Sequence, residues 1–268
     1  MDPHDIAAEV FATLGSGRQI EPFSARVPGF DLPASYRVAA EVRAKREARG
    51  ERPVGRKIGF TNRTIWREYD VWAPIWGYVY NRTVRALPAH GEAFPLAGLA
   101  EPRIEPEIVF GLSAAPEAGM DDAALAGCID WVAHGFEIVQ SLFPGWKFAA
   151  PDTVAAFGLH GALLVGPRQA LAPHRDAWLR RLETFEIDLL CDGVVRDRGR
   201  AHNVLDGPLH ALRHLINVLA QDSSQPALAA GELVTTGTLT RALPVAPGQT
   251  WSTRLHGIDL DGIEVTFG

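Results

Sequence analysis

The chain has 268 residues, a formal net charge of −6 and 47% hydrophobic residues, a composition typical of an ordinary globular protein. It carries no long basic run, which argues against nucleic acid and anionic membranes as partners and favours a small-molecule ligand. No stretch approaches the roughly 20 apolar residues of a membrane span, and the two cysteines form no metal-binding or disulfide pattern. We therefore expect a cytoplasmic location.

The first fifty residues predict helices. Apolar residues at helical spacing, followed by Gly15, predict an amphipathic helix over residues 3–14. A second helix over 33–48 follows Asp31, a residue type typical of N-caps. We expect a domain organisation in which residues 1–55 form a helical lead-in and residues 56–268 form a β-rich catalytic domain.

Beyond residue 55 strands dominate, interrupted by few helices. We expect a helical turn within 61–70 and helices over 121–132 and 208–220, the last capped by Asp206. Two Asp-Gly pairs, at 192–193 and 261–262, predict tight hairpins. Groups of strands without regular β-α-β alternation favour the α+β class with an antiparallel or mixed sheet. The expected strands are 56–60, 78–86, 103–112, 136–141, 156–165, 186–196, 232–236 and 250–267.

The segment 102–112 contains the most informative pattern in the sequence. If it is extended, Glu105 and Glu107 lie on one face, because side chains alternate along a strand. Two buried carboxylates side by side are costly unless a cation or a proton neutralises them, and a divalent metal would do so. Pro106 suits a strand edge or a bulge. The alternative is an edge strand whose two glutamates face water.

Glu137 is a third carboxylate, inside the otherwise apolar run 136–139. It is either a single surface residue or a residue held inside for a purpose. Three carboxylates without a histidine or cysteine motif would form an oxygen-rich site that suits Mg²⁺ or Mn²⁺. We expect the histidines, His134, His160 and His202 among them, to be structural.

Two further residues are candidates for chemistry. Lys57 lies between Gly55 and Gly59 and is either a solvated lysine or a cation that binds a substrate carboxylate or transfers a proton. Asp152 follows Pro151 and either orients substrate or water, or caps a turn. Dinucleotide, phosphate-loop and nucleophile-elbow motifs are missing from the sequence, which disfavours nucleotide chemistry and serine hydrolysis.

The order and spacing of five short segments resemble the 2-keto-4-pentenoate hydratase / 4-oxalocrotonate decarboxylase family, which is related to the fumarylacetoacetate hydrolase fold. The resemblance implies a mixed β-roll or barrel core, a small N-terminal helical region, and a homo-oligomer. It implies a divalent metal, Mg²⁺ or Mn²⁺, bound by Glu105, Glu107 and Glu137. The implied substrates are small 2-oxo or 2-hydroxydienoic acids from the catabolism of aromatic compounds. The matching segments are 57–59, 102–108, 136–139, 152–154 and 236–237.

The resemblance also implies roles for other residues. Lys57 would be the cationic acid/base group and Asp152 would orient substrate or water, while Thr236 would hold the substrate carboxylate. Hydratase members tend to carry an acidic residue where this chain has Ile75. We expect Ile75 and Trp76 to contact the substrate, as part of a bulkier and more apolar pocket wall.

The function expected first is hydration of such an acid through a metal-stabilised enolate, that is, a hydro-lyase. The alternative is a decarboxylase of the 4-oxalocrotonate type, which the absence of an acidic residue at position 75 favours. A carbon–carbon hydrolase would need a base-activated water, and the recognisable motifs contain no His-Glu pair for this role. A binding protein for 2-oxo acids without turnover is the non-enzymatic alternative.

Overall fold

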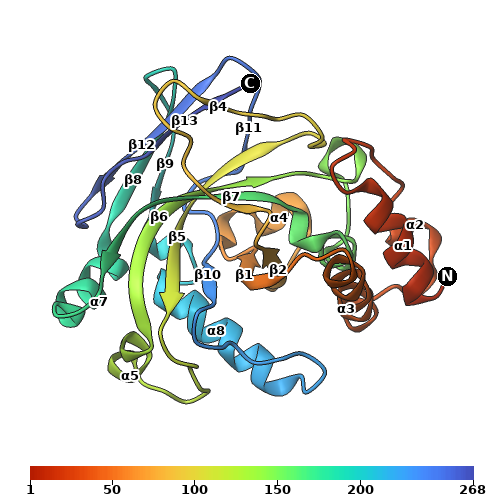
Figure 1. Cartoon of the computed structure of the whole chain (residues 1–268), viewed down its shortest axis with the longest axis horizontal. Helices are drawn as coiled ribbons and strands as arrows, with labels where there is room; N and C mark the ends of the chain where they lie inside the picture. Colours follow the sequence, from red (N-terminus) through yellow and green to blue (C-terminus); the bar gives the residue numbers. More distant parts are fainter.

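The computed structural model covers residues 1–268 and describes every side chain except those of residues 65, 68 and 69. Over the described residues the chain forms an eight-stranded sheet and a five-stranded sheet, with helices along the rims (Figure 1). This mixture of helices and two sheets confirms the predicted α+β class. None of the helices in the described part of the chain is long and apolar enough to cross a membrane.

The larger sheet is curled and contains parallel and antiparallel pairs. Its order is β2-β1-β10-β5-β6-β7-β3, and β11 pairs with β5 outside this path. In Figure 1, β5, β6 and β7 arch around the region where β1 and β2 lie. The bounds are β1 (Pro53–Gly59), β2 (Ile75–Tyr80), β3 (Val84–Ala86), β5 (Arg103–Leu112), β6 (Ile129–Val139), β7 (His160–Ala170), β10 (Leu233–Thr235) and β11 (Leu243–Pro244).

The smaller sheet covers the outer face of the larger one. Its order is β4-β13-β12-β8-β9. An apolar core joins the two sheets and includes Ile104, Phe136 and Ile138 from the larger one. Because side chains alternate along β5 and β6, the residues between these apolar ones point the other way, into the curl. The bounds are β4 (Ala93–Phe94), β8 (Glu186–Cys191), β9 (Val194–Arg200), β12 (Thr250–His256) and β13 (Glu264–Phe267).

Helices pack at two places on this framework. The N-terminal helices share one apolar cluster with the segment that follows β6, and α8 packs on a second cluster with β5 and β10. The helices are α1 (Pro3–Thr13), α2 (Phe23–Arg26), α3 (Leu32–Ala48), α4 (Trp66–Tyr69), α5 (Asp122–Gly127), α6 (Ala150–Ala155), α7 (Arg175–Thr184) and α8 (Pro208–Gln221). Single 3₁₀ turns occupy Arg63–Ile65, Pro144–Trp146, Phe157–Leu159 and Ala201–Asn203.

Several predicted boundaries are wrong. The helix expected over 121–132 ends at Gly127, because residues 129–132 belong to the long strand β6, paired on both sides. The strand expected over 156–165 starts only at His160, after the unpredicted helix α6. Helix α7 was also missed. In each case pairing or packing with distant segments outweighed the local preference.

The two Asp-Gly pairs behave differently. Asp192 and Gly193 have φ values of 51° and 77° and connect β8 to β9, which confirms the tight hairpin. At 261–262, the flanking strands β12 and β13 do pair as an antiparallel hairpin, but the expected tight turn is wrong, because β12 ends at His256 and β13 begins only at Glu264. The predicted cap of α8 is wrong too: its N-cap is Gly207, with no side-chain capping bond.

A buried ion pair ties α3 to the start of β1. The Arg46 guanidinium donates to Glu51 Oε2 from Nε at 2.9 Å and from Nη2 at 2.7 Å, and both side chains are almost completely buried. The same guanidinium lies 3.7 Å from the ring centroid of Tyr80 on β2. These contacts fix the N-terminal helices against the two strands that carry Lys57 and Ile75.

We expect Arg46→Met to lower the free energy of unfolding by about 3–5 kcal/mol, because it leaves much of the buried Glu51 charge uncompensated. Arg63→Met, which breaks an exposed pair with Asp206, is the matched control and should cost about 0–1 kcal/mol. Denaturant unfolding of both variants measures the difference. Equal losses would show that the buried pair has no special structural role.

Candidate metal centre and substrate pocket

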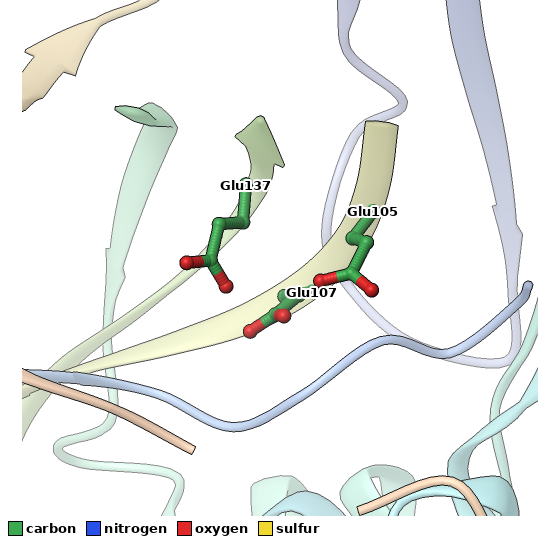
Figure 2. Close-up of side chains that lie close together, drawn as sticks. All are labelled: Glu105, Glu107 and Glu137. Carbon is green, nitrogen blue, oxygen red and sulfur yellow. The ribbon is translucent and has the colours of Figure 1, made fainter. Parts of the chain in front are cut away.

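Strand pairing brings three carboxylates to one point. β5 and β6 are antiparallel, and Glu105 stands directly opposite Glu137. Glu107 lies two residues further along β5, on the same face. One carboxylate oxygen from each of the three residues lies within 4.8 Å of the others. Figure 2 shows the side chains pointing toward one another from the two strands.

Glu107 is held from β10 and the loop that follows. Its Oε2 accepts hydrogen bonds from the Thr235 hydroxyl and from the Gly237 backbone N–H, the latter at 2.8 Å. Among the described residues, its Oε1 has no hydrogen-bond partner although it is buried. Gly237 has φ 102°, and a Cβ there would lie 1.7 Å from Thr61 Oγ1, so only glycine fits this close approach.

Glu137 is held from β7 and β1. Its Oε1 lies 2.7 Å from His160 Nδ1, and its Oε2 lies 3.2 Å from Lys57 Nζ. That second oxygen makes an ion pair but no hydrogen bond within the described structure. Glu107 therefore has one buried oxygen without a partner among the described residues, whereas the corresponding oxygen of Glu137 faces the Lys57 ammonium group.

Lys57 supplies the positive charge of the cluster. Its side chain is buried, and Nζ donates to the Gly158 carbonyl at 2.9 Å. Burial alone would lower the pKa of Lys57, but the nearby carboxylates of Glu137, Glu105 and Glu107 outweigh it and raise the pKa. The amine is therefore an ammonium ion at neutral pH.

Three carboxylates surround this single ammonium group, and their pKa values reflect the excess of negative charge. Burial, reinforced by Glu137, raises the pKa of Glu105 to about 7. Burial and the two neighbouring carboxylates raise the pKa of Glu107 well above its usual value. Glu137 is also buried, but Lys57 and His160 lower its pKa. A divalent cation would neutralise this excess negative charge, and hard carboxylate oxygens suit Mg²⁺ or Mn²⁺, so the residues present fit such an ion.

A pocket opens beside the carboxylates. Its polar side holds Lys57, Glu105 and Thr238, whereas most of the remaining wall is apolar. An apolar lining with a few polar groups is typical of small-ligand sites. The lining residues are Lys57, Ile58, Gly59, Phe60, Ile75, Glu105, Val139, Trp146, Gly158, Leu159, Thr238 and Ala242.

Position 75 and position 76 face opposite sides of β2. Ile75 lines the pocket, and its contact with substrate stays a prediction. The expected substrate contact of Trp76 is wrong: its ring stacks on Tyr36 of α3 at 5.1 Å, away from the pocket. Adjacent residues on a strand point in opposite directions, so both could not face the ligand. Bulky rings in the pocket wall come from Phe60 and Trp146 instead.

The roles expected for Asp152 and Thr236 also need correction. Asp152 is buried and accepts hydrogen bonds from the Ser24 N–H and hydroxyl and from the Ala149 N–H, so it caps α6 and fixes α2. Thr236 donates its hydroxyl to the Ile108 carbonyl at 3.0 Å and does not line the pocket, whereas Thr238 does. Neither residue lines the pocket, because each side chain forms hydrogen bonds with neighbouring backbone or side-chain groups of the fold.

Sequence reasoning missed His160. Its Nδ1 contacts Glu137 and its Nε2 lies 2.8 Å from Thr83 Oγ1, so both ring nitrogens have partners inside the protein. His160 and Glu137 therefore form a His-Glu pair, although the sequence motifs contain none and this was the argument against a carbon–carbon hydrolase. In this pair His160 orients Glu137 and does not line the pocket. No ligand-type spacing in the sequence links the two residues, which lie on separate strands, so only the fold reveals the pair.

Comparison with known proteins places this geometry in context. No family model matches the chain. A 4-oxalocrotonate decarboxylase from Pseudomonas sp. is 30% identical over 222 residues, covering 81% of this chain and 82% of the relative. The chain belongs to the 2-keto-4-pentenoate hydratase / 4-oxalocrotonate decarboxylase family. It is therefore an enzyme of the lyase type.

Other members of this hydratase/decarboxylase family match over nearly their whole length. A 2-keto-4-pentenoate hydratase from Burkholderia vietnamiensis is 29% identical over 263 residues, which is 98% of this chain and 96% of the relative. The solved structure of 4-oxalocrotonate decarboxylase from Pseudomonas putida G7, complexed with magnesium and adipate, has a TM-score of 0.88 and 25% sequence identity to this chain. The superposition covers 99% of this chain and 97% of the decarboxylase. Fumarylacetoacetate hydrolase family structures share the fold at lower similarity, which confirms the predicted fold type.

We expect Glu105→Gln to separate metal binding from stability. The substitution removes one of three mutually repelling charges, so the metal-free protein should become more stable by about 0.2–1 kcal/mol. Affinity for Mg²⁺ or Mn²⁺ should fall at least about a hundredfold, because a direct ligand is lost. Calorimetry and thermal unfolding measure the two effects, with the exposed Glu264→Gln as control. Unchanged metal affinity would contradict the ligand assignment.

Metal binding should also depend on pH. Since the pKa of Glu105 is raised to about 7 in the metal-free protein, a proton occupies this carboxyl below that pH and must leave when a cation binds. Mg²⁺ affinity should therefore increase from about pH 6 to about pH 8 with release of protons. Titration calorimetry in two buffers of different ionisation enthalpy measures the protons released. An affinity for Mg²⁺ that does not change with pH, without release of protons, would contradict the raised pKa of Glu105 in the metal-free protein.

Proposed function

We propose that the protein is a divalent-metal-dependent hydratase that acts on small 2-hydroxydienoic acids of the 2-keto-4-pentenoate type. The observation that carries the proposal is the convergence of Glu105, Glu107 and Glu137 on one point beside an ammonium group and a pocket. Relatives named 2-hydroxyhexa-2,4-dienoate hydratase and 2-keto-4-pentenoate hydratase support the same chemistry. The proposed cofactor is Mg²⁺ or Mn²⁺.

Each residue of the site has a distinct task in this proposal. A divalent cation held by the three carboxylates would supply Lewis acidity toward the oxygens of a 2-oxo acid and the enolate derived from it. Lys57, held by Glu137 and the Gly158 carbonyl, keeps a proton and a positive charge at the edge of the pocket. It attracts the substrate carboxylate and can donate a proton to the dienol carbon chain. The apolar wall excludes water from the rest of the ligand.

Activation of the attacking water differs from the acid-assisted pattern expected of hydratases. Ile75 places an alkyl group where an acid would otherwise face the pocket. Among the described lining residues, Lys57 and Glu105 are the only ionisable side chains. We propose that water is activated at the carboxylate end of the pocket, next to Glu105, rather than from β2.

A decarboxylase of the 4-oxalocrotonate type is the second candidate. Ile75 favours it, because loss of CO₂ needs no base for water, and the solved decarboxylase is similar over 99% of this chain. Both reactions would use the same stabilisation of negative charge at the keto oxygen. They differ in whether water adds to, or CO₂ leaves from, the far part of the substrate.

One experiment separates the candidates. Mg²⁺-loaded protein is mixed with 2-hydroxypenta-2,4-dienoate and, separately, with 4-oxalocrotonate. Hydration removes the ultraviolet absorbance of the dienoate without gas release, whereas decarboxylation releases CO₂ from oxalocrotonate. Metal-dependent turnover of the dienoate supports the hydratase. Tight binding of both acids without turnover would leave only the non-catalytic alternative.

We expect Lys57→Met to reduce turnover by about 10²–10⁴-fold while the cation still binds. The variant removes the positive charge that competes with a cation for Glu137, so affinity for Mg²⁺ should stay the same or increase. Steady-state kinetics at saturating Mg²⁺ and calorimetry give the two values. If metal affinity collapses together with activity, Lys57 is a structural residue.

The resemblance to this family also leads us to propose a homo-oligomer that works in the cytoplasm. Light scattering after size-exclusion chromatography measures the subunit number. The division into residues 1–55 and 56–268 stays a prediction, to be tested by expressing residues 56–268 alone.

A further inference from the structure

The ammonium group of Lys57 has one directional contact. An ammonium carries three N–H groups, and among the described residues only the Gly158 carbonyl accepts a hydrogen bond from it, at 2.9 Å. Glu137 attracts the same group at 3.2 Å as an ion pair without a hydrogen bond. An ion pair depends mainly on distance, whereas a hydrogen bond weakens steeply when it bends. The Gly158 carbonyl therefore fixes the rotation about Cε–Nζ and with it the direction of the other N–H groups.

The turn that carries this carbonyl has an unusual backbone. Phe157, Gly158 and Leu159 have φ values of 57°, 63° and 62°, so three consecutive residues are left-handed. This conformation crowds the Cβ of an L-residue and is uncommon outside glycine. The side chains of Phe157 and Leu159 are buried in the apolar cluster shared with the N-terminal helices, and this packing offsets the unfavourable backbone.

The turn is also tied to three neighbouring elements. The Leu159 N–H donates to the Ala156 carbonyl at 2.9 Å, directly after α6, and the Gln140 N–H, directly after β6, donates to the Leu159 carbonyl at 2.9 Å. A Cβ on Gly77 of β2 would lie 2.9 Å from the Phe157 carbonyl oxygen, so the turn packs closely on that strand. The turn is therefore the rigid partner of the contact, and the long lysine side chain is the flexible one.

Position 158 also limits the path of the lysine side chain. A Cβ there would lie 2.9 Å from Lys57 Cδ, which is closer than the usual contact distance of two carbon atoms. The lysine stem fits only because residue 158 has no side chain. Lys57 and Gly158 both line the pocket beside the carboxylates, so a shift of the stem would change where the ammonium group meets a ligand.

We propose that Gly158 is the positioning residue of Lys57. Its carbonyl orients the ammonium group and its lack of a Cβ admits the lysine stem, so that the remaining N–H groups are directed by the fold before a ligand binds. The consequence for turnover rests on the proposed function of Lys57. The positioning itself is a property of the protein without substrate.

Gly158→Ala tests the proposal against a matched control. The added Cβ would clash with a flexible side-chain atom, so the lysine stem should move and the turn should stay. Gly193→Ala places alanine at φ 77° in the hairpin between β8 and β9, where a Cβ would meet nothing within 4 Å. The control therefore imposes a similar left-handed backbone on alanine without any contact to Lys57.

Nuclear magnetic resonance follows Lys57 directly. The chain has only three lysines, Lys45, Lys57 and Lys147, so labelled lysine gives few side-chain signals, and Lys57→Met assigns one of them. We expect the Lys57 signals to change in Gly158→Ala and to stay unchanged in Gly193→Ala. The carbonyl ¹³C signal of Gly158 should shift in Lys57→Met, a measurement that does not require Gly158→Ala to fold. An unchanged signal in either experiment would overturn the proposal.

Turnover connects the positioning to the reaction. At saturating Mg²⁺, Gly158→Ala should lower kcat at least about tenfold and Gly193→Ala should not, because a misplaced catalytic group slows the reaction. In the Lys57→Met background, Gly158→Ala should cause no further loss, since its effect passes through the lysine. An equal loss in both backgrounds would show a merely structural role and overturn the proposal. If the wild-type protein turns over neither the dienoate nor oxalocrotonate, the proposed function fails, while the spectra still decide the positioning.

Discussion

The central constraint on the structure is the repulsion among three neighbouring carboxylates, of which Glu107 and Glu137 are buried and Glu105 is half-buried. Register in the β5–β6 pair places Glu105 opposite Glu137, and alternation adds Glu107 to the same face. Such a cluster is unfavourable by itself, since like charges opposite one another destabilise a sheet and burial removes their hydration. Lys57 offsets one charge, and His160 binds one oxygen of Glu137. The negative charge that remains would favour a bound divalent cation, as the proposed function requires.

The rest of the fold holds these mutually repelling carboxylates in place. The outer faces of β5 and β6 are packed on the smaller sheet through an apolar core, which holds both strands in register. β10 contributes Thr235, and the following loop brings the Gly237 N–H against Glu107. β1 brings Lys57, and the 3₁₀ turn Phe157–Leu159 receives its ammonium group at the Gly158 carbonyl. Stability supplied by the core thus offsets the cost of the charged centre.

Family membership and the pocket wall carry different information. In the proposed function, the carboxylates, the lysine and their supports would bind the 2-oxo acid end of a ligand. Phe60, Ile75 and Trp146 form an apolar part of the pocket wall. The acid that the resemblance to hydratases leads us to expect on β2 is replaced there by the alkyl side chain of Ile75.

The sequence by itself determined the α+β class and placed Glu105 and Glu107 on one face of a strand, because alternation along a strand is a local property that can be read from neighbouring residues. It marked Glu137 and Lys57 only as candidates, and their assignment to the site came from the resemblance to the family. Only the tertiary structure decided which strands meet. It paired Glu105 with Glu137, brought His160 and Thr235 to the carboxylates, and turned Trp76 toward α3. It also showed Asp152 and Thr236 to be framework residues, since their partners lie on segments far away in the sequence. Register and packing are long-range, so no local pattern specifies them.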